Sequence, residues 1–362
     1  MNVVLFCHSL LSDWNHGNAH FLRGVVTELI ERGARVDVYE PRDAWSVQNL
    51  VAERGPTALE AAPRAYPLIA PIRYDDRLDL QQATAAADLV IVHEWNDPRV
   101  VRDLGALRKR AAPFRLLFHD THHRSATSPH EIARYDLSGY DGVLAFGRVV
   151  RDLYLRNGWA GRAWTWHEAA DIRVFHPLPS QKEYDLVWVG NWGDEERTGE
   201  LEEFLIMPTG RLRDRKIAVH GVRYPRQALD RLAEARIEFR GYLPNLEAPH
   251  AYARSALTVH VPRRFYANGL SGVPTIRVFE ALACGVPLLC SPWVDTEGLF
   301  RAGEDYICVK DGRAMEVEIR NLLADEAARQ QMANNAAETI GRRHTCAHRA
   351  AQLLEICEEL GK

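Results

Sequence analysis

Short apolar runs alternate with amphipathic stretches along the whole chain. In the first half, apolar residues 2–7 precede a polar loop, a helical pattern over residues 19–32 that Gly33 ends, and a second apolar run over residues 35–39. A strand, a glycine-containing loop, a helix and a second strand in this order form a βαβ unit. The same pattern places further buried strands at residues 89–93, 115–119, 142–146 and 163–166. Such alternation predicts a parallel, doubly wound sheet.

The second half repeats this alternation after a segment that is typical of a linker. Residues 171–183 hold two prolines and many polar side chains. We therefore expect an α/β fold with two doubly wound parallel-sheet (Rossmann-like) domains, residues 1–173 and 184–340, followed by a helical segment, residues 341–362, that packs back on the first domain. Ligands of such sheets lie at the carboxyl ends of the strands, so the two domains are expected to face a cleft. Strands of the second domain are expected at residues 186–189, 217–220, 237–240, 258–261, 288–290 and 307–309, and final helices at residues 313–323, 326–340 and 347–360.

Composition narrows the class of protein. A chain of 362 residues suits two domains, and 46% hydrophobic with 26% charged residues is ordinary for a soluble globular protein. A formal charge of −4 argues against a nucleic-acid-binding surface, so no nucleic acid partner is expected. The six cysteines form no C-x-x-C pair, which favours reduced, buried thiols. The start of the chain does not resemble a signal peptide and no apolar run reaches about 18 residues, so we expect a cytoplasmic protein without a transmembrane segment.

The most informative segment is residues 271–292, SGVPTIRVFEALACGVPLLCSP. It predicts a loop, a helix that begins at Pro274 and ends before Gly285, and then a buried strand. Arg277 and Glu280 are three residues apart and share one face of this helix. The N–H groups at the start of the helix favour an anion such as a diphosphate, and the carboxylate can accept hydrogen bonds from sugar hydroxyls.

This segment resembles the donor-site signature of the group-1 glycosyltransferases, which have the two-domain GT-B architecture. The resemblance implies that Glu280 holds the ribose of a sugar nucleotide. The family has a second glutamate eight residues earlier, where this chain has Gly272. That departure is similar to the spore-maturation (CgeB-like) branch of glycosyltransferases, and it leaves open how the donor hexose is held. The alternative interpretation is an ordinary helix N-terminus with Glu280 in a structural ion pair.

The same resemblance implies a set of donor-binding residues on several loops. Arg197 stands where family members carry a lysine or arginine bound to the donor diphosphate; alternatively it is a surface arginine beside two glutamates. Tyr242 stands where the family binds the nucleotide base, and core packing is equally compatible with it. The complete set is Gly17, Asn18, Gly190, Asn191, Arg197, Tyr242, Ser271, Gly272, Thr275, Arg277 and Glu280.

Catalytic candidates follow two apolar strands of the first half. Glu94 comes directly after residues 89–93, and it or Asp97 is a candidate base for an acceptor hydroxyl if the enzyme inverts. His119 and Asp120 end the next strand, and the pair resembles one whose histidine contacts the donor sugar in group-1 enzymes. A metal site among the three nearby histidines is the competing interpretation, but their spacing is not a known ligand frame, so no metal is expected.

Together these features predict a hexosyltransferase-like glycosyltransferase that moves a sugar from a nucleotide-diphosphate sugar without a metal ion. No cofactor is expected besides that co-substrate, and the resemblance favours a UDP-sugar. The acceptor, a protein, a glycan or a small molecule, is expected on the N-terminal domain. Two alternatives remain open: a nucleotide-sugar 2-epimerase on the same fold, and a non-catalytic nucleotide-sugar-binding protein.

Overall fold

A computed structural model describes residues 1–110, 112–193 and 195–361. Its contacts divide the chain into two compact units, which are treated separately below. The first unit contains residues 1–171 together with the segment from Cys346 onwards, and the second contains Ile172–Thr345. In the described part of the chain, no helix combines the length and the apolar character that a membrane crossing requires.

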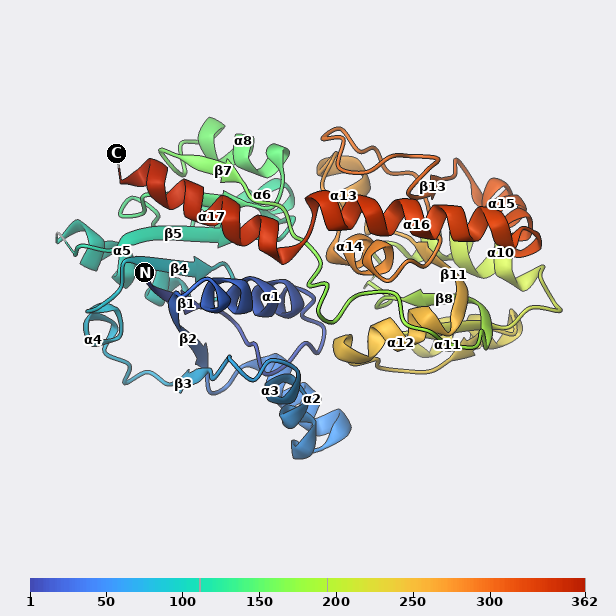
Figure 1. Cartoon of the computed structure of the whole chain (residues 1–362), viewed down its shortest axis with the longest axis horizontal. Helices are drawn as coiled ribbons and strands as arrows, with labels where there is room; N and C mark the ends of the chain where they lie inside the picture. The colour runs from blue at the N-terminus through green and yellow to red at the C-terminus, as the bar shows by residue number, and fades with distance from the viewer. Residues whose placement is uncertain (111, 194, 362) are drawn as a thin grey trace. The chain divides into compact units, whose positions relative to one another are not determined.

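The first unit is built on a seven-stranded, fully parallel sheet (Figure 1). Its strand order is β3-β2-β1-β4-β5-β6-β7, so the direction in which strands are added reverses between β1 and β4. Such a switch point is where doubly wound sheets bind ligands. The strands are β1 (Asn2–Phe6), β2 (Arg35–Pro41), β3 (Ile72–Tyr74), β4 (Leu89–His93), β5 (Arg115–Asp120), β6 (Gly142–Ala145) and β7 (Ala163–Thr165).

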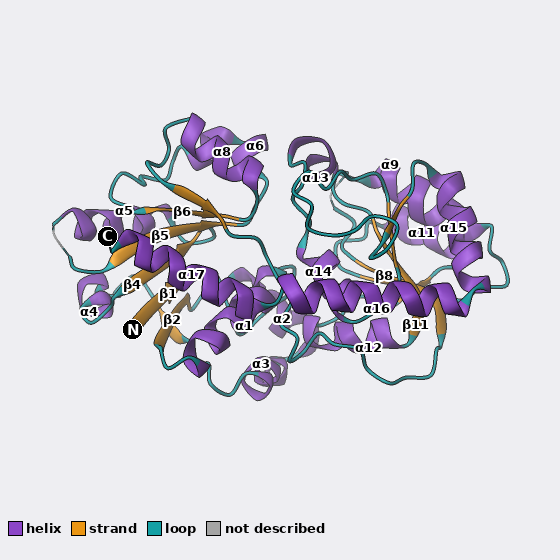
Figure 2. Ribbon diagram, turned by 45° about the horizontal axis from the view of Figure 1, so that its top comes forward, coloured by secondary structure: helices purple, strands orange, loops and turns teal. Residues whose placement is uncertain are grey.

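Helices cover this sheet, and the last helix of the chain belongs to this unit. Helix α17 (Cys346–Leu360) packs along α1 (Asn18–Glu31), and both views show the two helices side by side (Figures 1 and 2). A Cβ on Gly24 would overlap the sulfur of Cys346, so this close approach requires glycine. The other helices are α2 (Trp45–Arg54), α3 (Ala61–Ala65), α4 (Leu80–Thr84), α5 (Pro98–Lys109), α6 (Arg124–Thr127), α7 (Pro129–Ile132) and α8 (Arg148–Arg156), with a 3₁₀ turn η1 (Pro56–Glu60).

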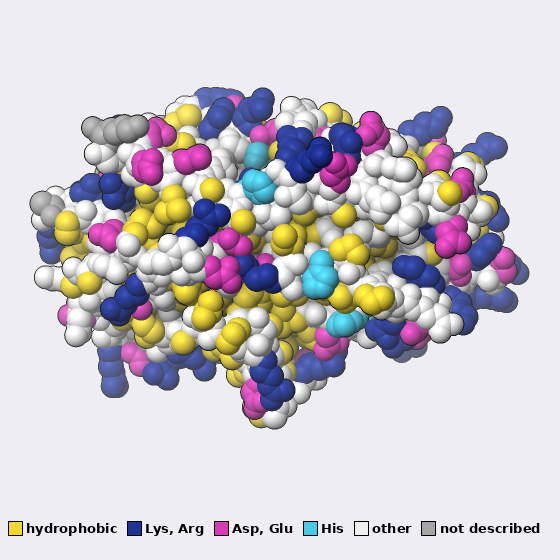
Figure 3. Space-filling view, in the orientation of Figure 1, with side chains coloured by type: hydrophobic (Ala, Val, Ile, Leu, Met, Phe, Trp, Pro, Cys, Tyr) yellow, Lys and Arg dark blue, Asp and Glu magenta, His cyan; other side chains and the backbone are white. Residues whose placement is uncertain are grey.

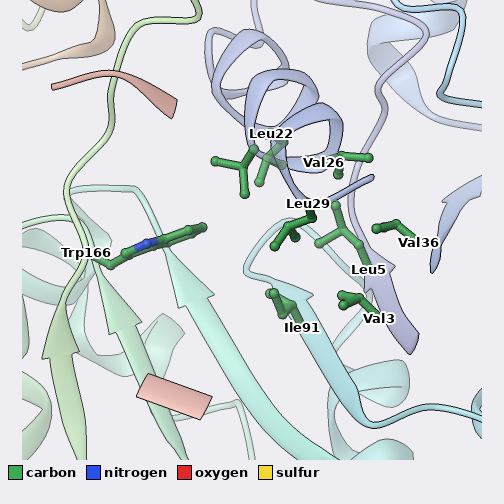
Figure 4. Close-up of a pocket in the computed structure, with 9 residues that line it drawn as sticks. Val3, Leu5, Leu22, Val26, Leu29, Val36, Ile91 and Trp166 are labelled. Carbon is green, nitrogen blue, oxygen red and sulfur yellow. The ribbon is translucent and has the colours of Figure 1, made fainter. Parts of the chain in front are cut away.

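A small cavity lies under α1, between the helix and the sheet (Figure 4). Apolar side chains such as Leu5, Leu22 and Ile91 line it, and the ring of Trp166 forms one side. A cavity with such a lining has no polar groups to hold water or a polar ligand. It is therefore a packing gap in the core rather than a site.

The second unit has a six-stranded parallel sheet in the order β10-β9-β8-β11-β12-β13, with its switch point between β8 and β11. Its core includes Trp188, Phe204 and Leu257. The strands are β8 (Tyr184–Val189), β9 (Ile217–His220), β10 (Glu238–Phe239), β11 (Ser255–His260), β12 (Leu288–Cys290) and β13 (Ile307–Cys308). The helices are α9 (Thr198–Leu201), α10 (Met207–Gly210), α11 (Arg226–Glu234), α12 (Ala248–Ala253), α13 (Arg264–Gly269), α14 (Ile276–Ala283), α15 (Gly312–Ala324) and α16 (Glu326–Arg343), with a π turn η2 (Glu202–Ile206) and a 3₁₀ turn η3 (Asn245–Glu247).

The α/β architecture with two parallel sheets is confirmed, and three local predictions are corrected. Helix α14 begins at Ile276 rather than at Pro274, because Thr275 is extended (ψ 159°) and forms the cap. Gly285 does follow the helix in a left-handed conformation (φ 62°), as predicted. The expected strand 237–240 shrinks to two residues, and Cys308 is exposed whereas the other five cysteines are buried.

Candidate functional site

The loops after β8 and β9 pack backbone against backbone, next to the switch point of the second unit. A Cβ on Gly221 would overlap the carbonyl oxygen of Gly190, and the Tyr224 hydroxyl donates to that same carbonyl at 2.8 Å. The side-chain oxygen of Asn191 accepts from the backbone N–H of Val222 at 3.0 Å. These contacts fix the predicted residues Gly190 and Asn191 in a rigid frame that leaves no room for a side chain at position 221.

Arg197 is buried in this frame rather than exposed on the surface. Its guanidinium donates to the carbonyl of Val261 at 2.8 Å and to that of Asn191, and it lies 5.0 Å from the ring of Trp188. Burial, and then the positive charge of Arg263, lowers the pKa of Arg197 to about 10, so the side chain stays charged at neutral pH. Gly193 adjoins it, because a Cβ there would lie 2.9 Å from its Nε.

Two more arginines add positive charge at this place. Arg263 follows β11 and pairs with Glu196 at 3.0 Å, and Arg277 lies on α14. Burial, and then the charges of Arg197 and Arg277, lowers the pKa of His260 at the end of β11 to about 3. Three guanidinium groups therefore act on the carboxyl end of one strand, which favours an anionic ligand there.

The start of α14 offers uncompensated donors next to these charges. No side chain caps the helix, and the Thr275 hydroxyl oxygen is buried without a hydrogen-bond partner among the residues that the structure describes. Ser271 is exposed in the preceding loop. An uncapped N-terminus with its positive dipole end suits a phosphate group.

Gly272 shows why this chain lacks a glutamate at that position. Its φ is 85°, and a Cβ would overlap the hydroxyl oxygen of Thr296 and lie 2.9 Å from the Cγ of Glu297. Its N–H donates to the carbonyl of Val294 at 2.9 Å, which ties the loop down. A side chain at 272 thus requires both a strained backbone and a displaced loop, while the structure brings Glu297 to the same spot.

Glu280 is fully buried and held by two partners. Asn245 donates to one carboxylate oxygen at 2.7 Å, and Arg277 donates to the other. The ion pair that the sequence offered as an alternative is thus present, with Arg277 28% exposed and Glu280 0% exposed. Tyr242 is buried as well, 8% exposed, after the left-handed Gly241.

In the first unit, Gly17 and Asn18 stand at the start of α1. Gly17 is the cap residue, and no side chain caps the helix. The Asn18 amide donates to the hydroxyl of Thr121, which follows β5. This contact links the loop after β1 to the end of β5.

Glu94 is engaged on both carboxylate oxygens. Thr121 donates its backbone N–H to one at 2.8 Å, and Arg124 donates to the other at 2.6 Å, with Glu94 itself fully buried. Asp97 caps α5, accepting from the N–H of Arg99 at 2.8 Å. Glu94 thus has the contacts of a residue that positions Arg124 and Thr121, whereas the Asp97 side chain is 43% exposed.

His119 and Asp120 lie at the end of β5 with no exposed surface. Neither ring nitrogen of His119 has a hydrogen-bond partner in the described part of the chain, and burial lowers its pKa to about 3, so the imidazole is neutral. Burial and the charge of Glu94 raise the pKa of Asp120, whose oxygen accepts from the Tyr154 hydroxyl at 2.8 Å. A neutral imidazole with unused nitrogens can donate to or accept from a sugar hydroxyl.

Other residues at these edges escaped the sequence analysis. Arg263 and Asn245 carry no motif, although the basic pair directly after an apolar strand was a usable signal for Arg263. Among the described residues, no group of three or more His, Cys, Asp or Glu side chains is arranged to hold a metal ion.

Part of the chain is similar to a known protein family. Residues 197–355 match the family model of glycosyl transferase-like proteins. The matched region begins at Arg197 and includes Tyr242 and residues 271–280. No curated protein sequence matches the chain.

Solved structures match over the full length at low identity. A sucrose-phosphate synthase from Thermosynechococcus elongatus has a TM-score of 0.69 and 17% identity, with 99% of each chain covered. Anabaena Alr3699/HepE in complex with UDP has a TM-score of 0.68 and 14% identity, covering 99% of this chain and 100% of that one. T4 phage BGT in complex with UDP and Mn²⁺ has a TM-score of 0.61 and 12% identity, with 99% of each chain covered.

The fold is therefore that of GT-B glycosyltransferases, and residues 197–355 are similar to glycosyl transferase-like proteins.

Proposed function

We propose that this protein is a glycosyltransferase that takes a hexosyl group from a UDP-sugar and moves it to an acceptor held by the first unit, without a metal ion. One observation carries the donor assignment: the charges of Arg197, Arg263 and Arg277 converge beside the uncapped start of α14, inside the region that matches the family. The complex of Anabaena HepE with UDP supports uracil as the base.

The chemistry needs charge compensation on the leaving group. The bond between the anomeric carbon and the diphosphate oxygen breaks, and the negative charge that develops on the diphosphate must be stabilised. Guanidinium groups and helix N–H groups do this best where water is excluded. We assign Arg277 and Arg263 to direct contact, since both are partly exposed, and Arg197 to the frame, since its N–H groups already bind backbone carbonyls.

Glu280 is proposed to hold the ribose, with Asn245 fixing one of its oxygens. In the ligand-free structure Arg277 covers the other oxygen. Donor binding would then draw Arg277 toward the diphosphate and release that oxygen for a ribose hydroxyl. Tyr242 would form the wall of the base site, together with the Gly190 and Asn191 loop.

In the first unit we assign the donor-sugar contact to His119 and a positioning role to Glu94 and Asp120. The unpartnered imidazole supports this, since a buried polar group without a partner costs about 1–3 kcal/mol and is retained where a ligand can satisfy it. Gly17 and Asn18 would place the N-terminus of α1 near the sugar or its diphosphate.

Calorimetry with UDP, GDP, ADP and UDP-glucose tests the donor site. UDP and UDP-glucose should bind, and Glu280→Gln should weaken them about tenfold or more, because hydrogen bonds to charged groups contribute about 1.5–3 kcal/mol. Glu326→Gln, at an exposed position on α16, is the matched control and should change nothing.

If no nucleoside diphosphate binds, the proposal is wrong. If Glu280→Gln binds like the natural protein, Glu280 is structural only. Product analysis with UDP-glucose separates the alternatives: an epimerised nucleotide sugar without acceptor indicates an epimerase, and binding without any turnover indicates a non-catalytic protein.

A further inference from the structure

Three tryptophans meet at the switch point of the first unit. Trp14 follows β1, Trp45 follows β2 and Trp95 follows β4, so each comes from the carboxyl end of one of three neighbouring strands. The ring centroids of Trp14 and Trp45 are 6.3 Å apart, and those of Trp45 and Trp95 are 6.4 Å apart. We call these three residues the tryptophan cluster.

Two buried histidines, His8 and His16, pack beneath the tryptophan cluster. The ring of His8 stacks on Trp45 at 4.5 Å, and His16 packs edge-on against His8 at 5.1 Å. Both histidines are buried, and burial lowers the pKa of His8 to about 4. The indoles above them are each only half-buried. Three half-exposed tryptophans in contact, at the edge where such sheets bind ligands, are typical of a binding surface rather than of a core.

Carboxylates and indole N–H groups are the main polar groups around the tryptophan cluster. The indole N–H of Trp14 donates to Glu53 at 2.6 Å. Within the part of the chain that the structure describes, the indole N–H groups of Trp45 and Trp95 have no protein partner. Asp43 lies close enough to act on the pKa of His8. Arg124 covers part of the ring of Trp95, with its charge balanced by Glu94.

We propose that the tryptophan cluster binds a pyranose ring of a carbohydrate acceptor. A pyranose has an apolar face of C–H groups, which suits the electron-rich face of an indole, and a rim of hydroxyls, which can pair with free indole N–H groups and carboxylates. This inference rests on the proposed function and names its acceptor as a glycan or glycoside. A nucleic acid, whose bases also stack on aromatic rings, is disfavoured by Asp43 and Glu53, because these carboxylates repel phosphates. On the face drawn in Figure 3, basic and acidic side chains are also interspersed.

Indole ¹H–¹⁵N NMR spectra test the tryptophan cluster directly, without a donor. The probes are the methyl glycosides of glucose, galactose, mannose and N-acetylglucosamine, cellobiose, and a single-stranded DNA 13-mer. At least one saccharide should shift the signals of Trp45 and Trp95 in a saturable way. Trp45→Ala and Trp95→Ala should raise its dissociation constant at least tenfold, and the corresponding Phe variants should keep part of the affinity.

Trp159→Ala is the matched control, since Trp159 is also half-buried in this unit but follows α8, away from these strand ends. It should leave the saccharide affinity unchanged within twofold, and all variants should bind UDP like the natural protein. No response to any saccharide, an equal loss in Trp159→Ala, or saturable binding of the DNA alone would overturn the inference. Failure of UDP binding in the natural protein would instead contradict the proposed donor site, so the two failures are distinguishable.

Discussion

The two sheets have the same topology around their switch points and opposite chemistry at them. In the first unit the strand ends carry neutral, buried imidazoles, carboxylates and indoles: His8, His93, His119, Asp120 and Trp45. In the second unit the corresponding place has glycine backbone and the charges of Arg197, Arg263 and Arg277. A diphosphate needs cations and close N–H groups, whereas a neutral sugar needs flat surfaces and unpaired donors or acceptors. Under the proposed function, the same topology would serve the donor in one unit and the acceptor in the other through different side chains at the strand ends.

The largest expected effect is a loss of folding stability at acidic pH, caused by the buried histidines of the first unit. His8 and His119 have pKa values of about 4 and 3, and the pKa values of His16 and His93 are also lowered, in each case mainly by burial. Unfolded histidines titrate near 6.5, so below that pH the unfolded chain binds more protons and the folded state loses stability as pH falls. Each histidine contributes about 1.4 kcal/mol per pH unit, and Asp120, with its raised pKa, opposes one of them.

Urea unfolding at pH 7.5, 6.5 and 5.5 should therefore show a loss of stability below pH 6.5 of several kcal/mol per pH unit, to which His220 and His260 of the second unit also contribute because their pKa values are lowered as well. His119→Phe should reduce this pH dependence by about the contribution of one histidine, because phenylalanine does not titrate. The variant should fold, because the ring at position 119 already packs between Phe21 and Trp166. His250→Asn, at an exposed position of the second unit, is the control and should leave the slope unchanged. A flat profile in the natural protein would mean that these histidines are solvated.

The next effect concerns the charged edge of the second unit. Arg277→Ala should lower kcat by about 10²–10³, since one donor to the developing charge is removed. Arg211→Ala removes an exposed arginine that pairs with Glu316, and it should leave turnover intact. Steady-state kinetics on both variants, with thermal unfolding as a check on folding, decide the matter. Equal activity of the two variants would remove Arg277 from the site.

The elements that could be predicted from the sequence are those with clear periodicity or a clear helix end. Strand periodicity and the helix end at Gly285 were sufficient to predict two parallel sheets and the segment 271–290. The predicted start of α14 was wrong because Thr275 has an extended backbone. The tightly packed loop around Gly272 determines this conformation, and the helix-start preference of Pro274 does not reveal it. The short strand β3 and helices α2 to α4 carry too few periodic positions to be recognised.

Side-chain partnerships were harder to predict than elements. Glu94 and Arg124 are 30 residues apart, and Asn245 and Glu280 are 35 apart, so only the folded chain brings them together. The tryptophan cluster likewise joins three loops that no local motif connects. Composition showed nine tryptophans, but their meeting point follows from the strand order.

A smaller effect is expected from substituting Gly272, in the loop before α14. Gly272→Ala combines a left-handed φ with an overlap on Thr296, and it should cost about 3 kcal/mol of unfolding free energy. Gly298→Ala is matched in φ (64°) but has no atom within 4 Å of the new Cβ, so it should cost only about 1–2 kcal/mol. Denaturant titration compares the two. Equal costs would mean that the 294–297 loop yields freely, and that a side chain at 272 is compatible with the fold.

The smallest expected effect is that of a chelator. A divalent clamp needs carboxylates that face the diphosphate, whereas the edge around Gly190 and α14 offers arginines and backbone N–H groups, and its Glu280 is held by Asn245 and Arg277. Turnover, measured with an acceptor from the saccharide panel, should therefore persist in excess EDTA. The Mn²⁺ in the T4 phage BGT complex shows that the architecture itself does not decide the question, so the measurement tests the side chains of this chain. Loss of turnover on chelation, restored by Mn²⁺ or Mg²⁺, would assign a metal role to a carboxylate such as Glu297, which lies beside Gly272, and would reduce the arginines to a supporting role.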